Sequence, residues 1–509
     1  MEYYKPTVLQ DFGGGWNPKW ALNAAQLQVN QSPYMVNADY AARFAITKRR
    51  GTSLVGNATS GAGGCSSLWN FTKMNGTEIL MRAHTTVLQH LSAGTWTDLQ
   101  TGLSSGAKFD SVVIGDTVYY GNAVNDFAYW TGTGAATTNA GLPKGNIYAQ
   151  AFFRLWIAGI TANPNRLSYS DVNAYTTFSS SEDFPSKIKS IKNFFTRDGV
   201  ETLLVFLENG YLYDVGFDTG GIYKRLVRIG VGSLSHRATK QLQNYNFVVD
   251  IFKSVSAVGY EEGTQDIRAT SRSSFIEDYL DTLTLSSSAA IYSKRNYVLA
   301  AQDPNGSTNN VELVYHEIYD SWRLYSGHAA ADYTIYQGKV TFASATDLNV
   351  YQYDSEKYSD NDVPIYFRYD TRGIDLEDPI RDKVCRYVKI AGFISTGCNI
   401  IVKSIADGRF SSPLSTKTIS GNGAYVDPTV AYPFGSAEYG AIPFAGLGGT
   451  SSTIEVRPFW VAMMLPEKKF DDLRLSFTNY QKDVDFIITH IKPVMAMTAD
   501  DRIPVVNQI

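Results

Sequence analysis

The chain has few charged side chains and no strongly basic region. Asp, Glu, Lys and Arg make up 18% of its 509 residues, against about 25% in an average globular protein. The 45 basic residues are balanced by 49 acidic ones, for a formal net charge of −4. Proteins that bind nucleic acid tightly usually carry a basic surface, so the composition argues against that class. The most basic stretch, Lys48-Arg49-Arg50, precedes a turn, and we expect it to be a solvated loop end.

Cysteine and histidine are also scarce. Cys65, Cys385 and Cys398 form no Cys-x-x-Cys motif, which excludes a zinc module of the usual spacing. Cys385 and Cys398 could face each other across a hairpin, but reduced thiols are favoured. The histidines lack the spacing of metal ligands, and we expect them to be ordinary strand residues: His84, His90, His236, His316, His328 and His490. The sequence therefore predicts no metal and no cofactor.

Long apolar runs are missing as well. No stretch approaches the 18 or so apolar residues of a membrane-spanning helix. The segment Met1 to Pro6 has neither the basic nor the apolar part of a secretory signal. We therefore expect neither a signal peptide nor a membrane span.

What the chain does contain predicts an all-β protein. Aromatic residues reach 13%, with 33 Tyr and 26 Phe, alongside 42 Gly, and this composition is typical of strands joined by tight turns. Turn pairs such as Asn75-Gly76, Gly115-Asp116 and Asn209-Gly210 separate short apolar strands. Such hairpins recur every ~35–50 residues from about residue 65 to 355, which is the period of a β-propeller blade. Paired β-sandwiches or a β-helix are the alternatives. One short helix is predicted at Phe275–Leu283.

Changes in composition and hydrophobic pattern along the chain predict three parts. Residues 1–52 have no clean hydrophobic period and are interpreted as an N-terminal extended arm. Residues 53–355 are interpreted as the β-propeller. After a polar, turn-rich linker, residues 356–509 again contain alternating strands and are interpreted as a C-terminal β-sandwich-like domain with a long loop at 419–453.

No catalytic signature is present. Gly13-Gly14-Gly15 neither follows a predicted strand nor opens a helix, so it is interpreted as a turn rather than a phosphate cradle. Neither Gly-x-Ser-x-Gly nor His-Glu-x-x-His occurs, and the Ser-x-Asp-x-Gly-x-x-Trp box of sialidase propellers is missing. Local carboxylate clusters suit solvated turns better than the paired carboxylates of a glycosidase: Asp278 with Asp281, Asp375 with Glu377 and Asp378, and Asp471 with Asp472. The chain is therefore predicted not to be an enzyme, with no catalytic, cofactor-binding or metal-binding residues.

One group of motifs does resemble a known family. The chain opens with Phe12-Gly13-Gly14-Gly15-x-Asn17, Gln31-Ser32-Pro33 with Asn37, and Lys48-Arg49-Arg50-Gly51. Later come Asn163-Pro164-Asn165-Arg166-Leu167-Ser168-Tyr169-Ser170 and Leu313-Val314-Tyr315 through Trp322, where His316 replaces the expected Asp. Together these resemble the tail hub or nozzle proteins of short-tailed bacteriophages, which stabilise the packaged DNA.

The resemblance implies a virion structural protein, assembled in the host cytoplasm. It would form a homohexameric ring in the tail, below the portal and its adaptor, and contact tail fibre, spike or needle proteins. The ring would retain the genome and serve as the conduit for dsDNA during ejection, without sequence-specific binding. A nearly neutral, Tyr-rich and Ser-rich chain suits this role, because each neutralised phosphate adds affinity and friction. The arm and the 419–453 loop are the segments expected to contact neighbours, with a self-packed segment or a disordered loop as the alternative for each.

Two other functions remain open. A propeller with exposed aromatics over carboxylates could bind or cleave carbohydrate, as in host-receptor recognition. A generic scaffold for protein–protein binding is the third hypothesis. The lack of a signal peptide counts against a conventionally secreted glycosidase.

Overall fold

The computed structural model describes most of the chain and divides it into two compact units. The described residues are 5–6, 8–20, 26–41, 45–195, 199–242, 245–260, 267–375, 382–409, 411–422, 456–466 and 468–497. The propeller unit comprises residues 53–318 and 326–353. The sandwich unit comprises residues 1–52, 319–325 and 354–509.

The propeller unit contains five complete antiparallel sheets, each of four strands in sequence order. The first two are β8 (Cys65–Thr72), β9 (Glu78–His84), β10 (Val87–Ser92) and β11 (Thr95–Gln100), then β12 (Asp110–Ile114), β13 (Thr117–Gly121), β14 (Phe127–Trp130) and β15 (Thr137–Asn139). The third and fourth are β16 (Ile147–Ala151), β17 (Arg154–Ala158), β18 (Arg166–Tyr169) and β19 (Ser180–Asp183), then β20 (Ile188–Phe195), β21 (Glu201–Leu207), β22 (Tyr211–Asp218) and β23 (Gly221–Ile229). The fifth is β24 (Lys240–Leu242), β25 (Tyr245–Val249), β26 (Val255–Tyr260) and β27 (Ile267–Ser271).

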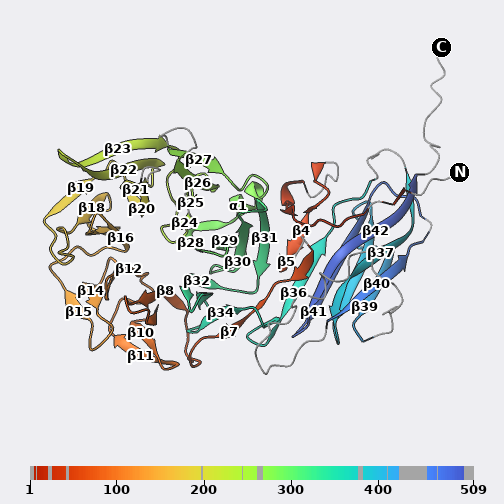
Figure 1. Ribbon diagram of the computed structural model, residues 1–509, viewed down its shortest axis with the longest axis horizontal. Coiled ribbons are helices and arrows are strands. Elements are labelled where there is room, and N and C mark those ends of the chain that lie inside the picture. Colours follow the sequence, from red (N-terminus) through yellow and green to blue (C-terminus); the bar gives the residue numbers. More distant parts are fainter. Residues whose placement is uncertain are drawn as a thin grey trace, which may run out of the picture. The chain divides into compact units, whose positions relative to one another are not determined.

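Two further sheets complete a ring. One contains β28 (Thr284–Ser293), β29 (Asn296–Gln302) and β30 (Val311–His316), and the other β32 (Ala330–Tyr336), β33 (Lys339–Ser344) and β34 (Val350–Asp354). The first strands of most successive sheets are neighbours, the fourth and fifth sheets meet through β23 and β27, and β32 of the last sheet contacts β8 of the first, so the series closes on itself. Figure 1 shows these sheets around a common centre. The predicted β-propeller is therefore confirmed, with seven sheets among the described residues.

The start of the propeller segment closes this ring. The end of β7 (Gly51–Leu54) lies beside β34, and the Val55 N–H donates to the Val350 carbonyl at 2.9 Å. The first residues of the propeller thus pair with its last strand. This closure leaves the last sheet without an open edge on that side, which protects it from pairing with other chains.

The local predictions inside the propeller are confirmed. Asn75-Gly76 joins β8 to β9, and Asn209-Gly210 joins β21 to β22. Gly76 and Gly210 have φ of 83° and 87°, a left-handed conformation that glycine adopts without a steric penalty. The predicted helix is α1 (Glu277–Thr282), which buries Leu280.

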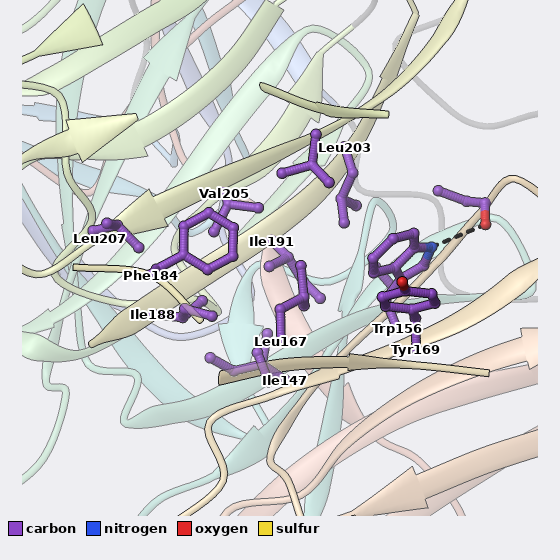
Figure 2. Close-up of a cluster of buried hydrophobic side chains, with 14 residues drawn as sticks. Ile147, Trp156, Leu167, Tyr169, Phe184, Ile188, Ile191, Leu203, Val205 and Leu207 are labelled. Carbon is purple, nitrogen blue, oxygen red and sulfur yellow. Dashed lines mark hydrogen bonds between the residues drawn. The ribbon is translucent and has the colours of Figure 1, made fainter. Parts of the chain in front are cut away.

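Apolar side chains between adjacent sheets form the propeller core. One cluster lies between the third and fourth sheets, where Ile147 and Leu167 meet Ile191, Leu203 and Val205. Figure 2 shows this cluster, with the rings of Trp156 and Tyr169 side by side, their centroids 4.7 Å apart. Trp156 is fully buried, and its Nε1–H donates to the Ala151 carbonyl at 3.0 Å. The indole therefore adds apolar area without leaving a buried donor unsatisfied.

The sandwich unit contains two sheets that pack face to face. The first has the order β40 (Val456–Met464), β37 (Lys383–Ser395), β42 (Phe486–Met497), β6 (Ile46–Lys48) and β5 (Ala38–Tyr40), with β1 (Lys5–Pro6) also on β42. The second has the order β39 (Ser415–Ser420), β38 (Asn399–Ala406), β41 (Leu473–Gln481), β36 (Val363–Asp370) and β4 (Tyr34–Val36). Phe367 of β36 meets Phe486 of β42 edge to face, with ring centroids 4.8 Å apart. The alternating patterns that predicted these C-terminal strands correspond to β36, β37, β38, β40, β41 and β42.

The described part of the predicted arm packs into the sandwich unit. Residues 15–16 (β2) and 31–32 (β3) pair in parallel, while β4, β5 and β6 join the two large sheets. Met35, Ala38 and Ile46 are fully buried. The segment is thus integrated with residues from the other end of the chain, which is the self-packed alternative. Residues 319–325, inside the range predicted as propeller, also belong to this unit, where Leu324 of β31 (Ser321–Ser326) pairs with Val36.

Lys48-Arg49-Arg50 is not a solvated loop end, so that prediction is wrong. Lys48 and Arg49 are almost completely buried. The Lys48 Nζ donates to the Gln481 carbonyl at 2.9 Å, and burial lowers the Lys48 pKa to about 8. Arg49 forms a two-pronged ion pair with Asp360. This burial could not be predicted from the sequence because the partner residues, Asp360 and Gln481, lie more than 300 residues away.

Other residues of the opening motif also hold the sandwich unit together. Asn17 donates from Nδ2 to Gln31 Oε1 at 2.9 Å. Asn37, at φ 53°, accepts from Arg49 Nε at 2.8 Å and donates to the Tyr366 carbonyl at 2.7 Å. The motif is therefore a set of buried polar contacts that fix local geometry, because each buried polar group needs a partner.

Candidate functional site

The residues with the most unusual charge environment lie at the centre of the propeller. They come from the first strands of the sheets or from the segments that lead into them. We call this set the channel cluster: Lys108, Asp110, Lys192, His236, Arg237, Lys240 and Asp332. Because the first strands surround the propeller axis, residues far apart in sequence meet here.

Arg237 ties three sheets together at the channel. Its guanidinium donates to the Ser66 carbonyl and the Ser67 hydroxyl of β8, each at 2.7 Å, and to the Phe109 carbonyl at 2.6 Å. It also lies 3.3 Å from Asp332 of β32. The planar fork of arginine suits such multiple contacts, so Arg237 is a structural element of the ring as well as a charge in the channel.

Asp110 and His236 form a second polar connection. His236 Nε2 lies 3.0 Å from Asp110 Oδ2, and its Nδ1 lies 3.0 Å from Ser190 Oγ. Burial, together with the charge of Lys192, lowers the His236 pKa to about 4. Asp110 also accepts the Tyr148 backbone N–H at 2.7 Å. At neutral pH the pair therefore consists of a neutral imidazole and a carboxylate.

Lys192 and Lys240 are two partly buried ammonium groups in the channel. Burial, and then the charge of Lys240, lowers the Lys192 pKa to about 8. Burial likewise lowers the Lys240 pKa, while Asp332 and Asp110 act in the opposite direction. Within the part of the chain that the structure describes, neither lysine forms an ion pair. The channel thus holds positive charge at a cost in folding free energy.

A cavity of about 440 Å³ opens at the end of the channel where these strands begin. Its lining comes from consecutive sheets and from the segments that precede β12, β20 and β24. The charged lining residues are Lys108, Lys187, Lys189 and Arg237, joined by the neutral His236. The other lining residues include Asn146, Thr161, Ser235 and Ser286. The volume lies within the range of roughly 300–1,000 Å³ typical of small-ligand pockets.

The histidines that the sequence singled out lie in strands and turns with ordinary partners. His84 hydrogen bonds to Gln89 at 3.0 Å, and the His90 ring lies 5.0 Å from the Trp130 ring. His328 lies 2.9 Å from the buried carboxylate of Glu312. His316 ends β30 and His490 lies in β42. Of the six, only His236 belongs to the channel cluster. Among the described residues, no group of three or more His, Cys, Asp or Glu could hold a metal ion.

The carboxylate clusters stay apart from the channel cluster. Asp278 and Asp281 lie on α1. Asp375 is buried beside Arg372, and its predicted neighbours Glu377 and Asp378 lie outside the described residues. Burial raises the pKa of Asp472, whose backbone N–H, like that of Asp471, donates to Asp407.

The glycine run and the cysteines are structural. A Cβ on Gly14 would lie 2.4 Å from Asn30 Oδ1, and Gly15 has φ +72°, so Gly13-Gly14-Gly15 is a tight turn. Cys65, Cys385 and Cys398 are buried free thiols, and burial raises the pKa of each to about 12. Such thiols are poor nucleophiles because little thiolate forms. Most of the predicted loop at 419–453, from residue 423 onward, lies outside the described residues.

Sequence reasoning missed the channel lysines. Lys108, Lys192 and Lys240 stand singly in different hairpins, with no shared spacing. The one available signal was their position in or just before the first strand of a predicted blade, where a charged side chain points to the axis rather than into the packing between sheets.

Comparison with known proteins identifies no family for this chain. No protein-family model and no curated protein matches the chain. Similar solved structures include YCF48 from Cyanidioschyzon merolae, at 10% identity and a TM-score of 0.40, covering 60% of this chain and 99% of that one. Another is BBS1N in complex with ARL6DN, at 12% identity and a TM-score of 0.38, covering 60% of this chain and 98% of that one. The chain's own sheets define it as a β-propeller protein.

Separately, none of the helices in the described ranges is long and apolar enough to cross a membrane.

Proposed function

We propose that this chain is a structural subunit of a bacteriophage tail, of the hub or nozzle type. In this role it assembles as a homohexameric ring below the portal and adaptor, retains the packaged genome and conducts DNA during ejection. The motif resemblance supports the proposal, and so does the structural use of the motif residues Asn17, Gln31, Asn37 and Arg49 described above. The observation that carries the proposal is an apolar outer surface on the sandwich unit.

This surface, here called the tyrosine face, covers the outer side of β36, β41 and β38. Tyr366 and Tyr480 are directly paired across β36 and β41, with ring centroids 6.4 Å apart. Tyr480 is 64% exposed, and Ile401 of β38 is 41% exposed. At the neighbouring strand the Arg368 guanidinium lies over the Tyr34 ring, 4.1 Å from its centroid. Tyrosine and arginine are enriched in protein–protein interfaces.

The opposite sheet of the sandwich also exposes apolar side chains. Trp460 and Met464 of β40 point outward, Met464 with 66% exposure. The Lys389 ammonium lies 5.9 Å from the Trp460 ring and 5.7 Å from the Tyr387 ring. A subunit in a closed ring contacts a neighbour on each side through two different surfaces. Two apolar outer faces on one unit meet that requirement.

The test measures the oligomeric state of the full chain. Mass photometry over a concentration series and negative-stain imaging should show rings, either alone or on a portal–adaptor complex. Tyr366→Ser combined with Tyr480→Ser should shift the population toward monomers. The matched control removes two similarly exposed apolar side chains on turns of the propeller, Met74→Ser and Phe252→Ser, and should leave assembly unchanged. Monomers under both conditions would contradict the proposal.

The carbohydrate alternative requires different chemistry at the cavity. Sugar sites usually combine aromatic faces with carboxylates, whereas the described lining of this cavity presents lysines and an arginine. Incubation with host surface polysaccharide separates the two hypotheses, because cleavage by monomers would favour the alternative and reject the ring.

A further inference from the structure

We infer that the cavity at the end of the propeller channel binds a small multivalent anion bearing phosphate or carboxylate groups. This inference goes beyond the proposed tail function, since a ring subunit needs no ligand there. It rests on the cavity, on the charges around it, and on the lack of counter-charges within it.

The charged groups come from different parts of the chain and converge on one space. Lys108 precedes β12, Lys187 and Lys189 lie at the start of β20, and Arg237 precedes β24. All four line the same cavity of about 440 Å³. No carboxylate side chain is among the described residues that line it. An anion in the cavity would therefore face positive groups from several directions.

Two of these four positive groups lack an ion-pair partner among the described residues. Lys189 is paired with Glu208 at 2.8 Å, and Arg237 lies beside Asp332. Lys108 and Lys187, in contrast, form no ion pair with any residue that the structure describes. Lys192 and Lys240 lie deeper in the channel, also without ion pairs in the described ranges, and add to the same field. Asp110, Asp332 and Glu208 are the carboxylates that act on these groups, so five lysines and one arginine stand against three carboxylates.

Keeping like charges together lowers stability, and a bound anion relieves that repulsion. The depressed Lys192 pKa, caused by burial and by Lys240, shows that the folded state disfavours its charge. Sites that keep mutually repelling charges in the folded state are often functional. Asn146 and Ser286 on the cavity wall can donate hydrogen bonds to the oxygens of the same ligand, whereas the hydroxyls of Thr161 and Ser235 already donate to the Ala123 and Ser288 carbonyls.

The size of the cavity selects the ligand class. A volume of about 440 Å³ accommodates a di- or triphosphate group or a tricarboxylate and excludes a DNA duplex. The lysines recognise charge without imposing a planar geometry, so phosphate and carboxylate ligands share the chemistry, and the experiment distinguishes them.

The experiment is isothermal titration calorimetry of the full-length chain with pyrophosphate and with citrate, each against sodium chloride of equal ionic strength. Saturable binding of pyrophosphate alone identifies a phosphate site, and binding of both identifies a general polyanion site. Lys108→Gln combined with Lys187→Gln should weaken binding at least tenfold. The control variant, Lys294→Gln combined with Lys339→Gln, removes two exposed lysines elsewhere in the propeller unit, one on a hairpin turn and one at the start of β33, and should bind like the wild type.

Two results would overturn the inference. One is no binding of either anion beyond the sodium chloride background. The other is equal weakening by the cavity and control variants, which would mean that only net charge matters. Unchanged circular dichroism and an unchanged melting temperature of each variant without ligand establish that loss of binding is not loss of folding.

Discussion

The buried ion pair between Arg49 and Asp360 leads to the most specific stability prediction. The Arg49 side chain is 1% exposed and that of Asp360 14% exposed. The guanidinium donates to both carboxylate oxygens, to Asn37 Oδ1 and to the Arg50 carbonyl. Asp360→Asn keeps the size of the side chain but removes the negative charge that pairs with the buried arginine. Removing one partner of a buried pair costs about 3–5 kcal/mol.

The assay must report on the sandwich unit alone, because a chain of two units does not unfold in a single transition. Hydrogen exchange with mass spectrometry of peptides covering β7 and β36 meets this need. A loss of 3–5 kcal/mol corresponds to a fall in protection of about two to three and a half orders of magnitude, since ~1.4 kcal/mol is tenfold. Peptides from the propeller strands β16 and β17 should be unchanged.

The matched control changes the carboxylate two residues further on. Asp362 pairs with Lys482 at 2.8 Å but is 78% exposed, and such pairs contribute little. Asp362→Asn should therefore leave the exchange pattern as in the wild type. If Asp360→Asn and Asp362→Asn behave alike, the role assigned to the buried pair is wrong. If Arg49→Met restores part of the protection lost in Asp360→Asn, the charge of the buried arginine is the cause.

Three further predictions concern packing, backbone space and pH. Trp156→Ala leaves a cavity in the core cluster of Figure 2 and should destabilise the propeller unit by about 3–5 kcal/mol. The measurement is the hydrogen exchange of β20 and β21 across a urea series. Gly51→Ala should reduce soluble yield and exchange protection at β7, because a Cβ there would lie 1.9 Å from the Ser359 carbonyl oxygen; wild-type behaviour would contradict the packing around β7. The His236 pKa is about 4 in the folded chain and about 6.5 in the unfolded chain. Between these two pH values the unfolded chain binds more protons than the folded chain. The His236 contribution to stability is therefore complete above about pH 6.5 and falls by up to ~1.4 kcal/mol per pH unit as the pH drops toward 4. His236→Gln should flatten the pH dependence of stability in that window, and an unchanged slope would show that His236 is not the titrating group.

The local part of the fold could be predicted from the sequence, and the contacts between distant segments could not. Asn75-Gly76 and Asn209-Gly210 identified hairpins because a two-residue turn depends on its own backbone preferences. The period of these hairpins was enough to predict a propeller. Closure of the ring by Val55 and Val350 has no local signal, since either segment could pair with any exposed edge.

The charged residues were harder to interpret for the same reason. Lys48 and Arg49 looked like a solvated loop because most lysines and arginines are exposed, and their partners Gln481 and Asp360 are distant in sequence. Lys192 and Lys240 gained their importance only when the ring brought them together. A charge pattern predicts a site only when its members are close in sequence, and neither group satisfied that condition.

The closure of the propeller by β7 also determines the order in which the protein can mature on the ribosome. The chain enters the propeller after Thr52 and leaves it near Tyr353, so roughly 300 residues separate the N-terminal and C-terminal parts of the sandwich unit. At about 5–20 residues per second, synthesis of that interval takes about 15–60 s. Throughout it, the strands β5 and β6 lack β42, whose Ile488 is the eventual partner of Ile46. The N-terminal strands therefore reach their final pairing last, and until β42 has been synthesised they must be kept from pairing with other chains.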